Sequence, residues 1–403
     1  MVGTIEHLIL LFLLTSGQAH STPAGCPGSP TRLPCLLLAS PTPPHPAMPS
    51  RRDFLLQATT GLAALAVAGQ AAARAAGTYT NPVYAGQFPD PFVLRHQGHY
   101  YAFGTTGQGR TADGRIFTLL TSDNLVNWKN AGGALTPPAG AEGADFWAPE
   151  VVYHQGTFYM YYSMGGGAIA ATVGHRLHVA TSKKPEGPYT QVALLDVPAS
   201  KFTIDAHPYQ DTDGQWYLFY ARDFIDSDNG YRPGTGLVVD RLLNMTRLAG
   251  ESRTVMRARH DWTVFEKNRT MPLYGNKTFA EWHTLEGPFV RRHGGKYYCF
   301  YSGANFLTPR YGVDYCVANS IMGPYSDQGA ANGPRVLHAV AGHVRGPGHH
   351  SHVMSPNGKT EYLVYHAWNK AMTERQLCID KLAWTADGPR CVGPTYTPQP
   401  VPA

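Results

Sequence analysis

From about residue 80 onward, apolar residues gather in short runs separated by glycine- and proline-rich turns, which is the pattern of short β-strands. One unit recurs five times, with a polar or proline-containing lead, a short apolar strand, a glycine turn and an aromatic-rich strand. The copies are FPDPFVLRHQGHYYAFGTT (88–106), WAPEVVYHQGTFYMYYSMG (147–165), IDAHPYQDTDGQWYLFYAR (204–222), LEGPFVRRHGGKYYCFYSG (285–303) and GHHSHVMSPNGKTEYLVYHAW (348–368). A further strand-like segment follows each copy.

Repeats of about 60 residues that hold three or four short strands are typical of propeller blades. We therefore predict an all-β fold, a five-bladed β-propeller over residues 77–403, with an insertion around residues 250–284 because the third interval is the longest. A stacked sandwich of unrelated hairpins is the alternative, but it does not explain five copies in phase.

The first 76 residues lack this pattern. Residues 48–76 begin with Arg51 and Arg52, continue with a weakly apolar stretch from Gly61 to Ala68, and end in small residues. This order predicts a non-globular export signal of the twin-arginine type, and hence a secreted or periplasmic protein. An amphipathic helix with an accidental arginine pair is the alternative. Residues 1–47 are expected to be a mis-called or disordered extension, with Met48 as the true start.

Composition excludes several classes of protein. Charged residues make up only 15% of the 403 residues, and the formal net charge is +5 without a Lys/Arg stripe, so we expect no nucleic-acid partner. No apolar run beyond the N-terminal region is long enough to span a bilayer, so we expect no membrane association after removal of the signal. Cys378 and Cys391 could form a local disulfide in an exported protein, whereas no cysteine spacing resembles a zinc site.

A propeller brings the starts of its innermost strands together around a central channel. Ionisable residues occur at that point in every copy: Asp90, Glu150, Asp205 with His207, Glu286, and His349 with His350. Clustered carboxylates repel one another, so a ring of them indicates a function rather than a turn or a cap. Aromatic residues nearby could form the walls of a sugar-binding site, and these are Phe88, Phe146, Trp147 and Trp282.

Three carboxyl groups around one pocket suit glycoside hydrolysis. One carboxylate takes a proton from water, and a protonated partner gives a proton to the leaving oxygen. A third carboxylate can raise the pKa of the acid by like-charge repulsion.

The segments NPVYAGQFPDPFVL, DFWAPEVVYHQGTFYMYYS, IDAHPYQDTDGQWYLFY and EGPFVRRHGGKYYCFYSG resemble the blade motifs of glycoside hydrolase family 43. That family contains arabinanases, α-L-arabinofuranosidases and β-xylosidases. The resemblance covers about residues 80–393 and implies hydrolysis with inversion at the anomeric carbon. It implies an arabinose- or xylose-containing oligosaccharide or polysaccharide as the partner, and GPGHHS followed by LVYHAW favours arabinose. The sequence makes no prediction of the oligomeric state.

The resemblance also implies roles for single residues. Asp90 matches the general base, Glu286 the general acid, and Asp205 the carboxylate that tunes the acid and orients the sugar. Substrate-binding roles are expected for Phe88, Trp147, Glu150, His207 and Arg375, of which Glu150 would act from behind the residues that touch the sugar. An alanine follows Asp205 where many relatives carry proline, which leaves the carboxylate intact.

No cofactor is expected to be required for the chemistry. His349 resembles the histidine that lies beside a central hydrated metal in arabinanase-like members, which implies a structural calcium ion in the central channel, held through water. Calcium prefers oxygen ligands, so a histidine that hydrogen-bonds the substrate is the rival interpretation.

Other functions remain open at this point. A carbohydrate-binding propeller without catalysis would share the fold, and a β-xylosidase would share the three acids with an arabinose-releasing enzyme. A fructan hydrolase is disfavoured because Pro-Asp-Pro stands where Asn-Asp-Pro would be expected. A mannoside phosphorylase is disfavoured because no Lys/Arg cluster marks the strand starts.

Overall fold

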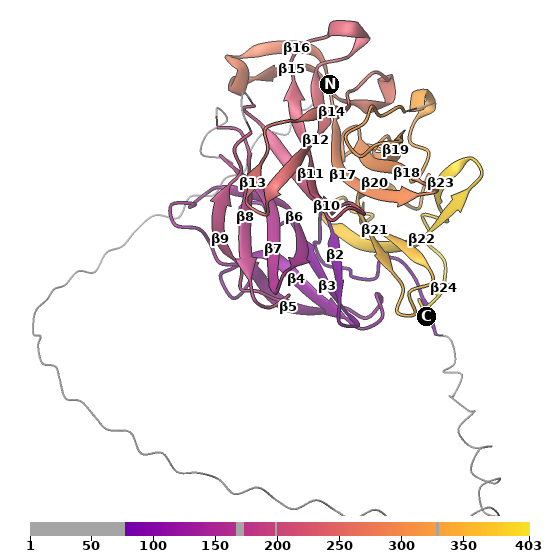
Figure 1. The fold of residues 1–403 in the computed structure, drawn as a ribbon. Helices are drawn as coiled ribbons and strands as arrows, with labels where there is room; N and C mark the ends of the chain where they lie inside the picture. The colour runs from indigo at the N-terminus through magenta and orange to yellow at the C-terminus, as the bar shows by residue number, and fades with distance from the viewer. Residues whose placement is uncertain (1–76, 167–172, 198–199, 328–329) are drawn as a thin grey trace, which may run out of the picture. The chain divides into compact units, whose positions relative to one another are not determined.

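The structure, a computed structural model, describes residues 77–166, 173–197, 200–327 and 330–403 (Figure 1). The predicted extension (1–47) and export signal (48–76) lie outside the described residues. Within the described ranges the chain forms strands and short 3₁₀ helices but no α-helix, which confirms the all-β prediction. The same ranges contain no helix long and apolar enough to cross a membrane.

Three antiparallel sheets have four strands each, in sequence order. The first comprises β2 (Phe92–His96), β3 (His99–Gly104), β4 (Ile116–Ser122) and β5 (Lys129–Leu135). The second comprises β6 (Asp145–His154), β7 (Thr157–Gly165), β8 (Arg176–Ser182) and β9 (Thr190–Leu194). The last comprises β20 (Arg345–Met354), β21 (Glu361–Trp368), β22 (Arg375–Thr385) and β23 (Gly388–Cys391).

The two sheets between them depart from this plan. One has three strands, β17 (Leu285–His293), β18 (Lys296–Gly303) and β19 (Gly312–Ala318). The other has seven, β10 (Thr203–Gln210), β11 (Trp216–Phe224), β12 (Gly234–Asn244), β13 (Arg247–Leu248), β14 (Arg253–Met256), β15 (Val264–Met271) and β16 (Lys277–His283). The 3₁₀ helices are η2 (Asp228–Gly230), η3 (Asp261–Thr263), η4 (Pro272–Tyr274) and η5 (Ala330–Asn332).

The propeller arrangement is confirmed, but the predicted count of five blades is not. Only three of the sheets are regular four-stranded blades. The predicted insertion is the physical reason for one departure, because β15 and β16 form a hairpin that joins the edge of its sheet through a parallel bridge between Gly234 and His283. This hairpin carries a small apolar cluster of its own, formed by Met271, Phe279 and Trp282.

The first strands of the sheets lie at the centre, where β2, β6, β10, β17 and β20 contact one another in cyclic order (Figure 1). The apolar cores lie between neighbouring sheets. One cluster, for example, joins Val93 and Tyr100 of the first sheet to Val364 and Ile379 of the last. Because each sheet is covered on both faces, the second strands are buried almost throughout, which explains why they are aromatic rather than alternating in sequence.

The ends of the described chain meet in a two-stranded sheet, β1 (Thr78–Tyr79) with β24 (Gln399–Pro400). The disulfide that Cys378 and Cys391 could have formed is not present, and both are free thiols. The strand register gives the reason, because Cys391 lies opposite Leu382 and not opposite Cys378.

Candidate active site

One residue near the start of each central strand has a left-handed backbone conformation, with a positive φ angle. The residues and their φ angles are Asp90 (52°), Ala148 (46°), Asp205 (59°), Gly287 (56°) and His349 (45°). In four of the sheets the pairing with the second strand shifts register at this point, as in a β-bulge. Left-handed backbone is costly for residues other than glycine, and it is concentrated at functional sites in proteins. The repeated bulge therefore marks where the fold aims side chains out of the regular sheets.

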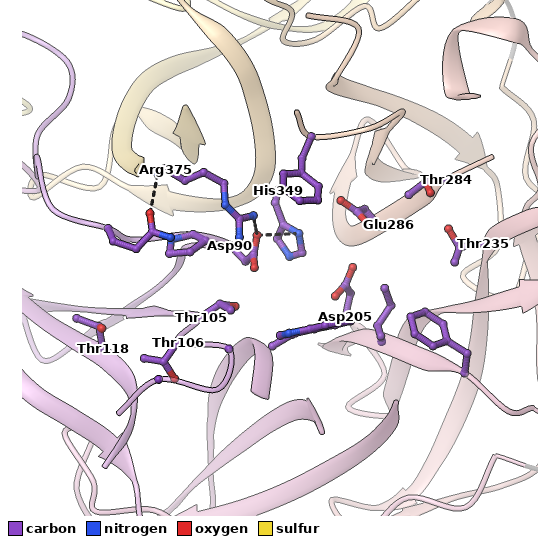
Figure 2. Close-up of a pocket in the computed structure, with 18 of the residues that line it drawn as sticks. Asp90, Thr105, Thr106, Thr118, Asp205, Thr235, Thr284, Glu286, His349 and Arg375 are labelled. Carbon is purple, nitrogen blue, oxygen red and sulfur yellow. Dashed lines mark hydrogen bonds and ion pairs between the residues drawn. The ribbon is translucent and has the colours of Figure 1, made fainter. Parts of the chain in front are cut away.

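These bulges open onto a pocket of about 830 Å³. The left-handed residues Asp90, Asp205 and His349 line it, and so do Trp147 and Glu286, which each precede a left-handed residue by one. Arg375, at the start of β22, reaches the same pocket. Figure 2 shows Asp90, Asp205, Glu286 and His349 directed toward one shared space. The structure thus brings together the three carboxyl groups predicted from the sequence. Two of the predicted substrate-binding residues, Trp147 and Arg375, line the same pocket.

Phe88 does not line this pocket, so its predicted contact with substrate is corrected. Its ring is fully buried, packs against Tyr84 at 5.9 Å between ring centroids, and lies so close to Gly104 that a Cβ atom at that position would be crowded against it at 3.0 Å. The Phe88 backbone N–H donates to the Arg375 carbonyl at 2.7 Å. Phe88 therefore anchors the strand that carries Arg375 and has no surface to offer a sugar.

Glu150 and His207 do not line the pocket either. For Glu150 this is compatible with the predicted place behind the residues that touch the sugar, whereas the direct contact predicted for His207 is corrected. Both stand two residues after a left-handed position, so they lie deeper along their strands than Asp90 or Asp205. The Val290 backbone N–H donates to His207 Nε2 at 3.1 Å, so the ring proton is on Nδ1, which donates to Glu150 Oε2 at 2.7 Å. We expected the ionisable residues at all strand starts to point into one channel. Glu150 and His207 instead form a hydrogen bond that links β6 to β10.

Asp90 is held in its ionised form. Burial alone would raise its pKa, but nearby cations and donors hold the pKa of this carboxyl well below its usual range. Arg375 Nη1 lies 2.9 Å from Asp90 Oδ1, and the His349 ring approaches the same oxygen at 3.5 Å (Figure 2). The His366 ring also approaches this oxygen at 3.5 Å. The Asp90 carboxylate is therefore available to accept a proton over the whole neutral range.

Glu286 has the opposite preference. Burial raises the pKa of Glu286 to about 7, with a further rise from the charge of Asp90. Two groups oppose this rise: the Tyr311 hydroxyl, which donates to Glu286 Oε1 at 2.6 Å, and Arg375. The Glu286 carboxyl can therefore carry a proton near neutral pH, as a general acid must.

Asp205 is coupled to Glu286. Burial and then the charge of Glu286 raise the pKa of Asp205 well above its usual value, while the Gly287 backbone N–H, which donates to Asp205 Oδ2 at 2.8 Å, opposes the rise. Two buried carboxyl groups that face one another titrate as a unit and retain a proton that isolated groups would have lost. The sequence predicted that Asp205 would tune Glu286, and this stays a prediction. The pKa shift seen here is that of Asp205, which the charge of Glu286 raises.

The calcium ion expected beside His349 stays a prediction. Among the described residues, no three His, Cys, Asp or Glu side chains are gathered as ligands for a metal ion. The His349 ring lies against Asp90 and faces the pocket, and burial lowers its pKa, so it is a neutral imidazole. The described side chains do not offer a direct ligand set for a hard cation, and the chemistry below assigns no step to one.

Sequence reasoning missed three groups that contact the carboxyl groups or line the pocket. Tyr311 lies in a loop outside the repeats and carries no recognisable signal. His366 lies in the LVYHAW segment, and its Nδ1 accepts the Asp90 backbone N–H at 3.2 Å. Asp223 lines the pocket from the end of β11, where only the length of the following insertion hinted at added structure.

Comparison with known proteins agrees with this geometry. The model of glycosyl hydrolases family 43 matches residues 79–389. The chain is 26% identical over 330 residues to an extracellular exo-α-(1→5)-L-arabinofuranosidase of Streptomyces avermitilis, covering 77% of this chain and 62% of that protein. It is 25% identical over 328 residues to the β-D-galactofuranosidase xynD of Aspergillus niger, covering 76% of this chain and 83% of that protein.

Among solved structures, the crystal structure of a thermostable family-43 glycoside hydrolase is similar with a TM-score of 0.67 and 32% identity, covering 81% of this chain and 99% of that one. The family match extends over most of the chain and includes all three pocket carboxyl groups. The chain therefore belongs to glycosyl hydrolases family 43, a family of glycosidases.

Proposed function

We propose that the protein is an inverting glycoside hydrolase that releases α-L-arabinofuranosyl or β-D-xylosyl groups from plant cell-wall polysaccharides or their oligosaccharides. Asp90 is the general base that takes a proton from the attacking water, and Glu286 is the general acid that protonates the leaving oxygen. Asp205 positions the sugar and shares a proton with Glu286. The arabinose-releasing activity is favoured over a β-xylosidase.

One observation carries this proposal, namely the opposite protonation of two carboxyl groups that line one pocket. The Arg375 guanidinium keeps Asp90 ionised, whereas burial lets Glu286 carry a proton near pH 7. A base and an acid that are both ready at neutral pH are what hydrolysis by inversion requires. A carbohydrate-binding propeller would have no need of this difference in pKa.

The names of relatives support the choice of substrate. Two exo-α-(1→5)-L-arabinofuranosidases of Streptomyces species share 26% identity with the chain, and a β-xylosidase of Formosa agariphila shares 29% over 147 residues. Both Streptomyces relatives are named extracellular, which supports export of this chain, by the twin-arginine route that residues 48–76 suggest. The cyclic contacts of β2, β6, β10, β17 and β20 support counting the two irregular sheets as blades of the same ring.

The test is product analysis by NMR on linear arabinan and on arabinofuranosyl and xylopyranosyl aryl glycosides. We expect release of arabinose or xylose, and release of neither would refute the proposal. Glu286→Ala should abolish turnover of the polysaccharide and retain sugar binding. Glu251→Gln is the matched control, because Glu251 is exposed and pairs with Arg241 away from the pocket. A binding protein without catalysis would show no turnover even before substitution.

A further inference from the structure

The pocket continues beyond Glu286 on the side away from Asp90. Trp282, Thr284 and Glu286 alternate along the chain and all three line the pocket, so the wall runs without a break from Glu286 to the β15–β16 hairpin. Figure 2 shows Thr284 and Thr235 on the far side of Glu286 from Asp90 and Arg375. If Glu286 is the acid, as the proposed function has it, this part of the pocket faces the leaving group.

Two charged side chains, Asp223 and Arg269, line this part of the pocket. Asp223 lies at the end of β11, opposite Thr235 of β12, and the Thr235 hydroxyl oxygen accepts the Leu285 backbone N–H at 3.2 Å. Asp223 is therefore connected to the residue next to Glu286 through one cross-strand pair and one hydrogen bond. Arg269 comes from β15, and its charge is felt by Asp223.

The hairpin holds both groups in place. The Tyr274 hydroxyl, at the tip between β15 and β16, donates to Asp223 Oδ2 at 2.7 Å. The Arg269 guanidinium lies over the Phe265 ring at 4.7 Å and near the Trp282 ring at 5.9 Å, and one of its nitrogens lies 3.4 Å from Glu266. Burial raises the pKa of Asp223 to about 7, while Tyr274 and Arg269 oppose the rise. Asp223 is therefore a largely buried carboxyl group in which only Oδ2 accepts a hydrogen bond from the described part of the protein. Its other oxygen could accept a hydrogen bond from a ligand hydroxyl.

We propose that Asp223 and Arg269 bind the sugar on the leaving-group side of the scissile bond, with Phe265 as its apolar wall. The hydroxyls of a sugar ring donate to the carboxylate and accept from the guanidinium, and an aromatic ring packs against the apolar face of the sugar. The pocket would then prefer a saccharide leaving group to an apolar one. This inference rests on the proposed function, because the roles of Asp90 and Glu286 define which side the leaving group occupies.

The experiment compares two substrates that differ only in the leaving group. One is α-1,5-linked arabinotriose, or β-1,4-linked xylotriose if wild type releases xylose, and the other is the aryl glycoside of the same sugar. The aryl group carries no hydroxyls for Asp223 to bind. Asp223→Ala should lower kcat/KM on the trisaccharide by about 10-fold or more, the usual cost of a lost hydrogen bond to a charged group, and change kcat/KM on the aryl glycoside less than about threefold.

Asp223→Asn and Tyr274→Phe provide milder variants should the alanine variant fail to fold, and each should show the same difference between the two substrates. Lys267→Ala is the control on the same hairpin, because Lys267 is exposed, pairs with Glu281 and does not line the pocket. Equal losses on both substrates, or no loss on either, would overturn the inference. So would a shift of the alkaline limb of the pH profile, since the effect would then pass through Glu286. A wild type that releases neither sugar would refute the proposed function instead.

Discussion

The hydrogen bond from Tyr311 to Glu286 allows a direct test of the acid. Tyr311→Phe removes the hydroxyl that donates to Glu286 Oε1 at 2.6 Å and retains the ring, which stacks 5.8 Å from the His366 ring. In the wild type this hydrogen bond stabilises the ionised carboxylate more than the neutral acid. Its removal therefore raises the pKa of Glu286. The acid is active when protonated, and a higher pKa therefore extends activity to higher pH.

The magnitude follows from the strength of such a bond. A hydrogen bond to a charged group contributes about 1.5–3 kcal/mol, and the neutral acid retains part of it. A difference of about 1.4 kcal/mol between the two forms corresponds to one pKa unit, which would move Glu286 from about 7 to about 8. At pH 8 the protonated fraction then rises from about one tenth to about one half, so activity relative to the plateau rises about fivefold.

The assay is kcat/KM on an oligosaccharide between pH 5 and pH 9, since this ratio reports the pKa values of the free enzyme. Tyr297→Phe is the matched control, because its hydroxyl bonds Asp211 far from the pocket carboxyl groups. An alkaline limb that stays in place in Tyr311→Phe, or moves to lower pH, would refute the assignment of Glu286 as the group whose deprotonation ends activity.

Two further substitutions test other parts of the site. Arg375→Met removes the cation 2.9 Å from Asp90 and near Glu286, so the pKa of both carboxyl groups should rise and both limbs of the pH profile should move to higher pH; an unchanged acidic limb would contradict the role of Asp90. Glu150→Ala leaves the buried Nδ1–H of His207 without an acceptor, so urea unfolding should report a loss of about 1–3 kcal/mol, whereas KM should change little because Glu150 does not line the pocket. A large rise in KM at unchanged stability would return Glu150 to the substrate-binding residues.

Much of the fold was predictable because it repeats. The five copies gave the all-β propeller arrangement, and the long third interval gave the insertion that became the β15–β16 hairpin. The number of strands in each sheet was not predictable, because short edge strands such as β23 carry little sequence pattern. The pairing of Cys391 opposite Leu382 depends on a register that the sequence does not reveal.

The candidate site was predictable where the chemistry alone marks the residue. Asp90, Asp205 and Glu286 are acidic residues at strand starts, where an acid has no structural reason to stand. Phe88 was misassigned because an aromatic residue at a strand start can pack in a core or form a wall of a sugar-binding site. Only the residues around it in the fold show which of the two it does.

His207 was misassigned for a different reason. Which residues face the pocket depends on the position of each left-handed residue, and a shift of two along the strand moves the side chain from the pocket to the interior. Tyr311 and Asp223 could not be found from sequence, because each acts through a contact with an element distant along the chain.

The stereochemistry of the first product tests the central claim most directly. Proton NMR of the earliest product from an aryl α-L-arabinofuranoside, or an aryl β-D-xyloside if xylose is released, reports the anomer before mutarotation. If Asp90 activates water while Glu286 protonates the leaving oxygen, the first sugar to appear has the anomeric configuration opposite to that of the substrate. A first product with the configuration of the substrate would contradict the account, since one of the carboxylates would then have formed a covalent bond to the sugar.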